Sequence, residues 1–507
     1  MKAKIKAKFK KLALPFEKYF PPVRLGVILL GIISVILLFV PPITGAVDDG
    51  SYNLIIHANG LREYPNDLNY FKYFVPKFLI LQYYNPYKYA YLSLQNILIQ
   101  IAILLNKIFY STKVFDIRFL GVIYTILFLL AARLLFKGLS RNLKGGKAYL
   151  IVLLGVFFFG DTTYITYFNS FYVEPLEMIM IMFFVGFGLM AFQQTENKAI
   201  LKYYGGQLLV AFLFIFVSKE LAFIMSALCI SLIGGLLFIR SHQWKIAAMI
   251  IVGSLVPISL FTETLYSNPQ HNENAYQSMT LGAMPAFKDT EKNLAQTDID
   301  PQTEILEGTP YAATYVIAPS NSKTITKGFI DELSYGKLSW YYLTHPSIFS
   351  KLLQMGLENE NIAYTKNISN YEKGVSEASK RVKPSFRWAT IIKGAFLPKK
   401  FGFYLFLTIL VLALYGISCV RGLQMGSKLY EARFFMNVGL ILMMLMSFIA
   451  PLIISGETSA SRKLIMASIL TNIILLIIVS DTLQHDIWIT KDTVLLTKIE
   501  EQSKNEK

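Results

Sequence analysis

The sequence has 507 residues, of which 54% are hydrophobic and only 16% are charged, and its formal net charge is +16. So small a share of charged residues excludes an ordinary soluble protein and indicates a chain that crosses a membrane many times. The basic residues stand beside apolar stretches, which favours membrane anchoring over nucleic-acid binding as the reason for their excess. The two cysteines, Cys229 and Cys419, both lie in apolar stretches, so we expect neither a disulfide framework nor a thiolate metal site.

A lysine-rich segment precedes the first apolar stretch, residues 23–43. At about 1.5 Å per residue this stretch is long enough to cross a hydrocarbon core of roughly 30 Å. A cleavable signal peptide is the alternative, with Thr44-Gly45-Ala46 as a small-residue cleavage site. Because the apolar stretch is longer than a usual signal core, we expect a retained signal anchor whose N-terminus stays in the cytoplasm.

Further spans are predicted from the later apolar stretches, at residues 116–136, 148–160, 176–193, 205–218, 221–239, 246–262, 402–420, 434–454 and 464–480. Lysine and arginine gather in the loops on the side of the N-terminus, which are 137–147, 194–204, 240–245 and 421–433. The opposite loop near 161–175 contains neither residue type. This alternation obeys the positive-inside rule, so the predicted fold class is an all-α integral membrane protein with about ten transmembrane helices.

Three regions between the spans are predicted to lie at the outer face. Residues 91–110 are apolar, but a crossing there would invert the charge alternation, so we expect an interfacial helix. Residues 70–90 have the aromatic composition of an interfacial belt, and the polar stretch 263–400 is predicted to be an outer-face domain. The predicted domains are a basic cytoplasmic N-terminus (1–22), a transmembrane catalytic core (23–262), the outer-face domain (263–400), three C-terminal spans (401–480) and a cytoplasmic tail (481–507).

Charged residues from several loops are predicted to meet at the outer ends of the spans. Charges at such positions are costly unless they are solvated or paired, and they are often functional. A transporter would place its charges on broken helices at the middle of the membrane, whereas acids and bases that converge on one face suit an interfacial enzyme. The candidate site residues are Asp48, Asp49, Arg118, Asp161, Glu174, Lys219 and Arg462.

Transfer of a sugar from a polyprenyl phosphate to a hydroxyl group would use such a set. A carboxylate at the membrane face can take the proton of the acceptor. Arginine or lysine, with or without a divalent cation, can neutralise the departing phosphate while its lipid tail stays in the bilayer.

Several motifs resemble the GT-C superfamily of membrane glycosyltransferases, which use polyprenyl-phosphate sugars and include protein O-mannosyltransferases, aminoarabinose transferases and bacterial surface-glycan hexose transferases. The matching stretches are Asp48-Asp49-Gly50 after the first span, Phe115–Leu120 at the head of the second, Tyr172–Leu176 at the head of the fourth and Phe216–Lys219 after the fifth. The family usually carries Asp-Glu where this chain has Asp48-Asp49, so the choice of base between the two stays open.

The resemblance implies an inverting transferase in the plasma membrane, of a bacterial type, with its active site on the outer face. It assigns Asp48 or Asp49 as the general base. It places Glu174, Asp161, Lys219, Arg118 and Arg462 around the donor. A divalent cation is the candidate cofactor, with Asp49 and Glu174 as candidate ligands. The expected partners are the lipid-linked donor, a glycan, lipid or protein acceptor and membrane lipid, and no nucleic acid.

Two other functions stay open at this point. A lipid-linked glycan flippase or transporter should show charges at the middle of its spans or repeated halves, and neither is visible in the sequence. A non-catalytic assembly protein would leave the one-sided set of acids and bases unexplained. Each candidate residue also has a structural alternative: the acids can cap helices, and the basic residues can anchor to lipid headgroups.

Overall fold

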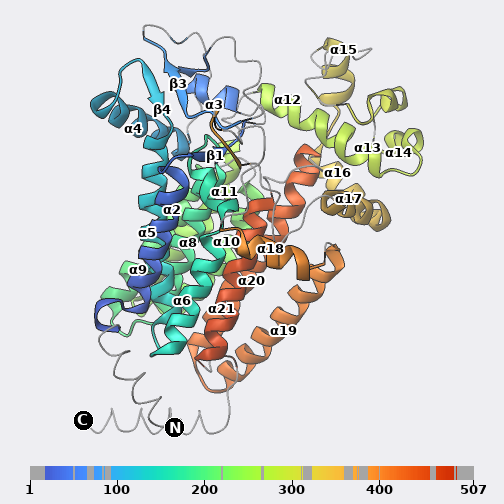
Figure 1. Cartoon of the computed structure of the whole chain (residues 1–507). Helices are drawn as coiled ribbons and strands as arrows, with labels where there is room; N and C mark the ends of the chain where they lie inside the picture. The colour runs from blue at the N-terminus through green and yellow to red at the C-terminus, as the bar shows by residue number, and fades with distance from the viewer. Residues whose placement is uncertain are drawn as a thin grey trace.

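The computed structural model describes residues 17–48, 52–64, 73–82, 85, 93–217, 221–263, 268–297, 299–309, 311, 322–358, 369–373, 375, 386–398, 400–456, 464–484 and 487. Long helices form a bundle, and short strands and helices cover one of its ends (Figure 1). We call this the upper end, as it is drawn in Figure 1, and the opposite end of the bundle the lower end.

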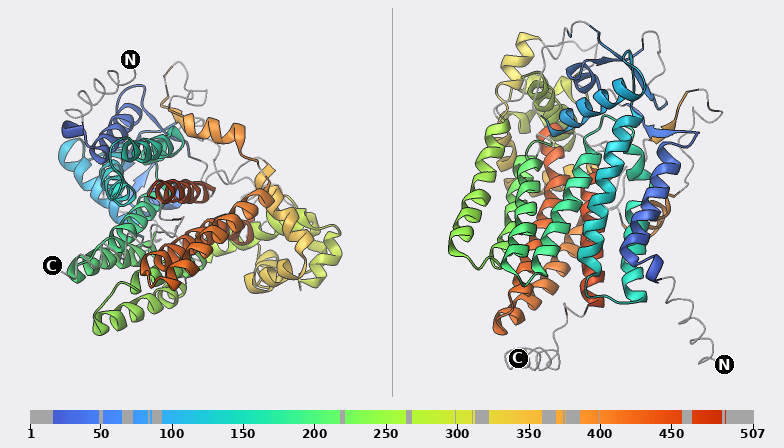
Figure 2. Two further views of the ribbon diagram at one scale, coloured as in Figure 1. Left: turned by 90° about the horizontal axis from the view of Figure 1, so that it is seen from below. Right: turned by 90° about the vertical axis from the view of Figure 1, so that its left-hand side faces the viewer.

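Each of the ten stretches predicted to span the membrane is a helix in the structure. These helices are α2 (Pro22–Leu38), α5 (Arg118–Ser140), α6 (Gly146–Phe159), α8 (Glu174–Phe192), α9 (Asn197–Phe214), α10 (Leu221–Leu236), α11 (His242–Glu263), α19 (Phe401–Gln424), α20 (Lys428–Ser455) and α21 (Leu464–Leu483). They run roughly side by side along the length of the bundle (Figure 2).

Within the described residues, six of these helices are long and apolar enough to cross a membrane on their own: α5, α8, α11, α19, α20 and α21. A seventh crossing is possible if α6 and the short helices that follow it, α7 (Thr162–Ile165) and η2 (Thr166–Phe168), form one span bent by 54°. Helix α2 is apolar but shorter, with 17 residues. The protein is therefore a multi-pass membrane protein, and the count of ten spans stays a prediction.

Burial separates the centre of the bundle from its rim. In α8 and α21 the most apolar stretch is 89% and 83% buried inside the protein, whereas in α11 and α19 it is only 22% and 28% buried. Helices α10 and α20 approach each other closely at Gly439, where an added Cβ would stand 2.6 Å from the carbonyl oxygen of Ala227. Small residues at such crossings allow membrane helices to pack backbone against backbone.

The upper end contains five short strands in the described residues, which the all-α prediction missed. Strand β1 (Thr44–Ala46) pairs antiparallel with β5 (Ser369–Tyr371). Strands β2 (Leu61–Arg62), β3 (Lys77–Ile80) and β4 (Val114–Asp116) form a second antiparallel sheet. Each strand has two to four residues, too few to show a period of two, and β1 pairs with a strand from a distant part of the chain.

Two further helices belong to the first loop at the upper end. Helix α3 (Tyr52–Ala58) follows the Asp48 region, and α4 (Leu94–Phe109) occupies the stretch predicted to be interfacial. One face of α4 is exposed and apolar, including Leu104 and Ile108, whereas Asn106 on the other face is buried. Such a helix suits the surface of a membrane.

The described parts of the stretch 263–400 form short helices, most of them beside the upper end of the bundle (Figures 1 and 2). They are α12 (Asn268–Gln277), η3 (Ser278–Ala283), α13 (Met284–Ala286), α14 (Thr290–Gln296), η4 (Pro301–Leu306), α15 (Lys323–Ile325), η5 (Thr326–Ile330), α16 (Tyr335–Thr344), α17 (Pro346–Glu358) and α18 (Trp388–Phe396). The stretch also reaches into the rest of the protein, because β5 pairs with β1 and α18 packs on α6.

Candidate functional site

Asp48 lies between β1 and α3 at the upper end of the bundle, and it is only 8% exposed. Its Oδ1 accepts a hydrogen bond of 3.2 Å from the backbone N–H of Tyr52, the first residue of α3. A carboxylate at this place is stabilised by the unpaired N–H groups and the dipole of the helix start. Asp48 is therefore a buried acid held in a fixed position by α3.

Tyr172 joins the Asp48 loop to the loop that precedes α8. Its hydroxyl donates a hydrogen bond of 2.7 Å to the carbonyl oxygen of Val47, the neighbour of Asp48. Its ring packs on the ring of Tyr52, with 4.7 Å between the centroids. Because Tyr172 lies two residues before Glu174, these contacts bring the regions of the first and fourth predicted spans together.

Helix α4 fixes the same loop from the other side. The side-chain amide of Gln95 donates hydrogen bonds of 2.6 Å and 2.9 Å to the carbonyl oxygens of Phe171 and Tyr172. Gln95 is 1% exposed, so both bonds are shielded from water. The loop before α8 is thus held by α3 and α4 together.

Two buried acids stand at the start of α8. Glu174 is its first residue and Glu177 lies one turn further, and they are 6% and 7% exposed. Residues three apart on a helix share a face, so both carboxylates belong to the same side of α8. Glu177 was not among the predicted site residues, although the stretch Glu174-Pro175-Leu176-Glu177 shows the spacing in the sequence.

Glu63 is a further acid near Asp48 that sequence reasoning missed. It follows β2 and is half-buried. Burial raises its pKa, and the negative charge of Asp48 raises the pKa further. The fold thus brings two carboxyl groups close enough to repel each other, an arrangement that is common in sites that move protons.

Arg118 begins α5, as predicted, and is held by Asp116. Its Nε donates to Oδ1 at 2.9 Å, and a second guanidinium nitrogen lies 2.5 Å from Oδ2. The side chain of Asp116 is 2% exposed and that of Arg118 is 35% exposed. This two-point geometry fixes the guanidinium at the upper end while leaving part of it accessible.

Asp161 has a different environment. Its Oδ1 accepts the N–H of Thr163 at 2.9 Å and its Oδ2 accepts the N–H of Thr390 at 2.9 Å, and the residue is 1% exposed. These bonds cap α7 and attach α18 to it. These hydrogen bonds do not involve the loop that carries Asp48. The contacts described around Asp161 therefore connect α7 to α18.

Lys393 of α18 lies at the same connection and was not singled out in the sequence. Its Nζ donates to Asn472 Oδ1 at 3.0 Å and to the Tyr164 hydroxyl at 3.4 Å. Lys393 is only 6% exposed, so its ammonium group is buried among these polar side chains. The only signal in the sequence was one lysine within an otherwise apolar stretch.

Three predicted site residues, Asp49, Lys219 and Arg462, lie outside the described residues. The parts of the chain that the structure does describe contain no group of three His, Cys, Asp or Glu side chains that could hold a metal ion. No ligand set for a divalent cation can therefore be built from these parts.

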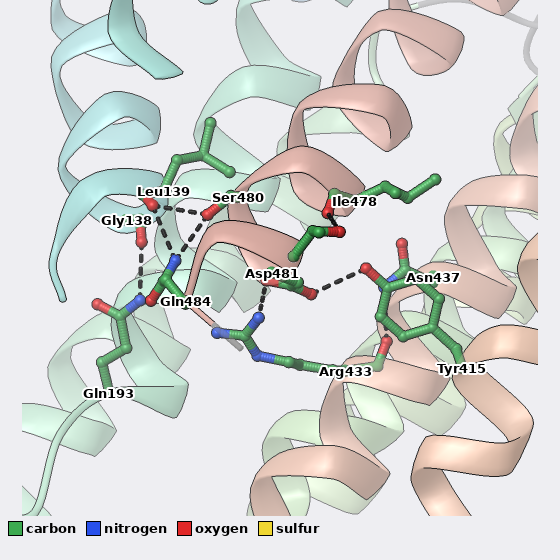
Figure 3. A network of polar contacts seen from close by, with 11 residues as sticks. Gly138, Leu139, Gln193, Tyr415, Arg433, Asn437, Ile478, Ser480, Asp481 and Gln484 are labelled. Atoms are coloured by element: carbon green, nitrogen blue, oxygen red, sulfur yellow. Dashed lines mark hydrogen bonds and ion pairs between the residues drawn. The ribbon is translucent and has the colours of Figure 1, made fainter. Parts of the chain in front are cut away.

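A buried ion pair stands within the membrane helices near the lower end (Figure 3). Arg433 of α20 pairs with Asp481 of α21, and the Tyr415 hydroxyl of α19 donates to Asp481 at 2.8 Å. The predicted spans 434–454 and 464–480 ended just short of both charged residues, which lie near the lower ends of α20 and α21 and not at the middle of these helices. The helices continue past the apolar stretches because the two charges neutralise each other.

The same network attaches α21 to α5. The hydroxyl of Ser480 and the amide of Gln484 donate to the carbonyl oxygen of Leu139, at 2.7 Å and 3.0 Å (Figure 3). The charged pair and these bonds connect helices to one another. The network therefore stabilises the packing of these helices and does not form an open binding site.

Comparisons with known proteins give one match. Neither the curated proteins nor the solved structures yielded a match to this chain. A family of membrane domains matches residues 6–506, which is nearly the whole sequence. The chain belongs to the family described as the YfdI N-terminal transmembrane domain.

Proposed function

We propose that this protein is a membrane glycosyltransferase of the GT-C type, which moves a sugar from a polyprenyl-phosphate carrier to a hydroxyl group of a cell-surface acceptor. The observation that carries the proposal is the joining of the Asp48 loop to the start of α8 through Tyr52 and Tyr172. It brings together, at one end of the bundle, acids that the resemblance assigns to the base and to the donor site.

In the proposed reaction the carboxylate of Asp48 takes the proton of the acceptor hydroxyl. The acceptor oxygen forms a bond with the anomeric carbon, and the bond from that carbon to the phosphate oxygen breaks. The phosphate leaves on its lipid, and the configuration at the carbon is inverted. Arg118 and Lys219 would neutralise the phosphate as its charge grows, which lowers the barrier more than it strengthens ground-state binding.

The half-buried Glu63 gives the site a second carboxyl group beside Asp48. Glu174 and Glu177 supply acceptors for sugar hydroxyl groups at the head of α8. A divalent cation stays a prediction, because the candidate ligand Asp49 lies outside the described residues.

Bond cleavage distinguishes this proposal from a flippase. Purified protein in lipid vesicles is incubated with polyprenyl-phosphate-linked sugars and a mixture of glycan and lipid acceptors. A transferase releases free polyprenyl phosphate in equal amount to the sugar transferred. A flippase moves the intact donor between leaflets, so movement of the donor without release of polyprenyl phosphate would contradict the proposal.

The proposal also places the upper end of the bundle on the non-cytoplasmic side. Single cysteines are introduced at Tyr64 and Ile305, which are 43% and 61% exposed, in a chain without Cys229 and Cys419. Both should react with a membrane-impermeant thiol reagent in intact cells. A cysteine at Trp244, at the lower end, should react only after permeabilisation. Labelling of just one of the first two sites would contradict the assigned topology.

A further inference from the structure

Helix α18 has an unusual distribution of side chains for a segment beside the polar outer-face region. Its exposed residues are large and apolar: Trp388, Ile391, Ile392 and Phe396 are 54%, 51%, 48% and 79% exposed. Its buried residues include the polar Thr390 and Lys393. The helix thus turns its polar side to the protein and its apolar side outward, which is the reverse of a helix in water.

The polar side of α18 is firmly attached to the bundle. The N–H of Thr390 bonds to Asp161 at 2.9 Å, and its hydroxyl lies 3.1 Å from the hydroxyl of Thr163. One turn on, Lys393 bonds to Asn472 of α21 at 3.0 Å. These buried bonds fix which face of the helix points away from the protein.

The depth of α18 follows from α6. This helix has 14 residues and rises about 21 Å, less than the roughly 30 Å of a hydrocarbon core. It starts at Gly146, at the end of the basic loop 137–147, which belongs at the lower membrane boundary. Asp161, two residues beyond the end of α6, and the attached α18 therefore lie below the upper boundary of the hydrocarbon core.

The membrane helix that follows α18 in the chain also exposes apolar side chains. Only a few residues separate α18 from α19, and Figure 1 draws α18 crosswise at the level of the upper part of α19. The first half of α19 exposes further large apolar side chains, which are Leu405, Phe406, Ile409 and Leu410. Both helices thus expose large apolar side chains at this level of the bundle.

We propose that α18 lies in the upper half of the bilayer, with Trp388, Ile391, Ile392 and Phe396 in contact with phospholipid acyl chains. The helix anchors the stretch after β5 in the membrane and holds the bent connection between α6 and α7 from the lipid side. This assignment is independent of the proposed glycosyl transfer.

Three isoleucines of similar exposure provide a matched test. Ile392 on α18, Ile409 on α19 and Ile305 on η4 are 48%, 59% and 61% exposed. Each is replaced by cysteine in the full chain without Cys229 and Cys419, labelled with a nitroxide and reconstituted into phosphatidylcholine–phosphatidylglycerol vesicles. Electron paramagnetic resonance then measures collisions of the label with lipid-soluble oxygen and with a water-soluble nickel chelate.

We expect the label at 392 to behave like the label at 409, with more oxygen collisions than nickel collisions, and the label at 305 to show the opposite ratio. A ratio at 392 that matches 305 would overturn the proposal. So would spin–spin broadening at 392 alone, because it would show that a second copy of the chain covers this face.

A second measurement needs no cysteine substitution. Phospholipids with brominated acyl chains quench tryptophans that contact them, and the chain has four tryptophans. The quenched share of the fluorescence should fall in the Trp388→Phe protein relative to the native protein. An unchanged quenched share would contradict the contact between α18 and lipid.

Discussion

Two clusters of charged side chains lie at opposite ends of the bundle, a buried one at the lower end and a partly buried one at the upper end, and they differ in the signs of their charges. At the lower end Arg433 and Asp481 have opposite signs and neutralise each other. At the upper end Asp48 and Glu63 have the same sign, and the pKa of Glu63 is raised by burial and by the charge of Asp48. A neutral pair stabilises contacts between helices, whereas like charges held together cost stability and are kept where chemistry needs them.

The largest expected loss of stability comes from breaking the ion pair of the lower cluster. Arg433→Met leaves Asp481 buried without its partner, and this should cost about 3–5 kcal/mol. The exchanged pair Arg433→Asp with Asp481→Arg should restore part of the loss. Thermal unfolding in detergent measures both, with the exposed Arg421→Met as the control. A loss no larger than that of Arg421→Met would show that the ion pair does not hold the helices.

Substitutions of the two acids at the start of α8, also at the upper end, should change activity instead of stability. Glu174→Gln keeps the size of the side chain but removes its charge, and we expect turnover to fall about 100-fold because a charge-assisted hydrogen bond to the donor sugar is lost. The turnover of the Glu177→Gln protein, which is changed one turn further along α8, should fall less, by about tenfold. Both proteins should unfold at nearly the native temperature. Kinetics at saturating donor concentration measure the turnover of each protein. Equal turnover in the native, Glu174→Gln and Glu177→Gln proteins would remove α8 from the proposed donor site.

The leaving phosphate gives a smaller and more specific effect. If Lys219 neutralises it, Lys219→Gln should lower kcat more than it raises KM for the donor, since the interaction strengthens as the bond breaks. Anchoring to lipid headgroups predicts no change in kcat. Steady-state kinetics against donor concentration separate these two roles.

The smallest effect is the pH dependence of the repulsion between Glu63 and Asp48. Because the folded protein raises the pKa of Glu63, ionisation of this group costs stability as the pH rises through its ordinary value of 4.5. Glu63→Gln should therefore unfold at a higher temperature than the native protein at neutral pH. The difference should vanish below that pKa, where Glu63 is protonated in both states. A difference that grows as the pH falls would contradict the repulsion.

Much of the helical framework could be predicted, because runs of apolar residues are visible in any sequence. Arg118 and Glu174 were expected at the heads of their helices, and α5 and α8 begin at these residues. The interfacial stretch 91–110 contains α4. Apolar length and the placement of single charges were sufficient for these elements.

Contacts between distant segments could not be predicted from one sequence. Thr44–Ala46 pairs with Ser369–Tyr371, and neither strand is long enough to show a pattern. Glu63 near Asp48 and Lys393 near Asn472 depend on the same kind of long-range packing. The position of Asp161 at the outer end of a span could be read from the sequence, but its hydrogen bonds to the backbone N–H groups of Thr163 and Thr390 could not, and its role at the donor site stays a prediction.

The role of Asp48 as base is tested most directly by comparing two capping aspartates. Asp48 accepts the N–H of Tyr52 at the start of α3, and Asp289 accepts the N–H of Lys292 at the start of α14. Asparagine caps a helix about as well as aspartate but cannot take a proton. Asp48→Asn should lower transfer from a purified lipid-linked donor by about 10²–10⁴-fold without loss of folded protein, and Asp289→Asn should leave it unchanged. More than a tenth of native activity in Asp48→Asn would show that Asp48 is a cap and not the base.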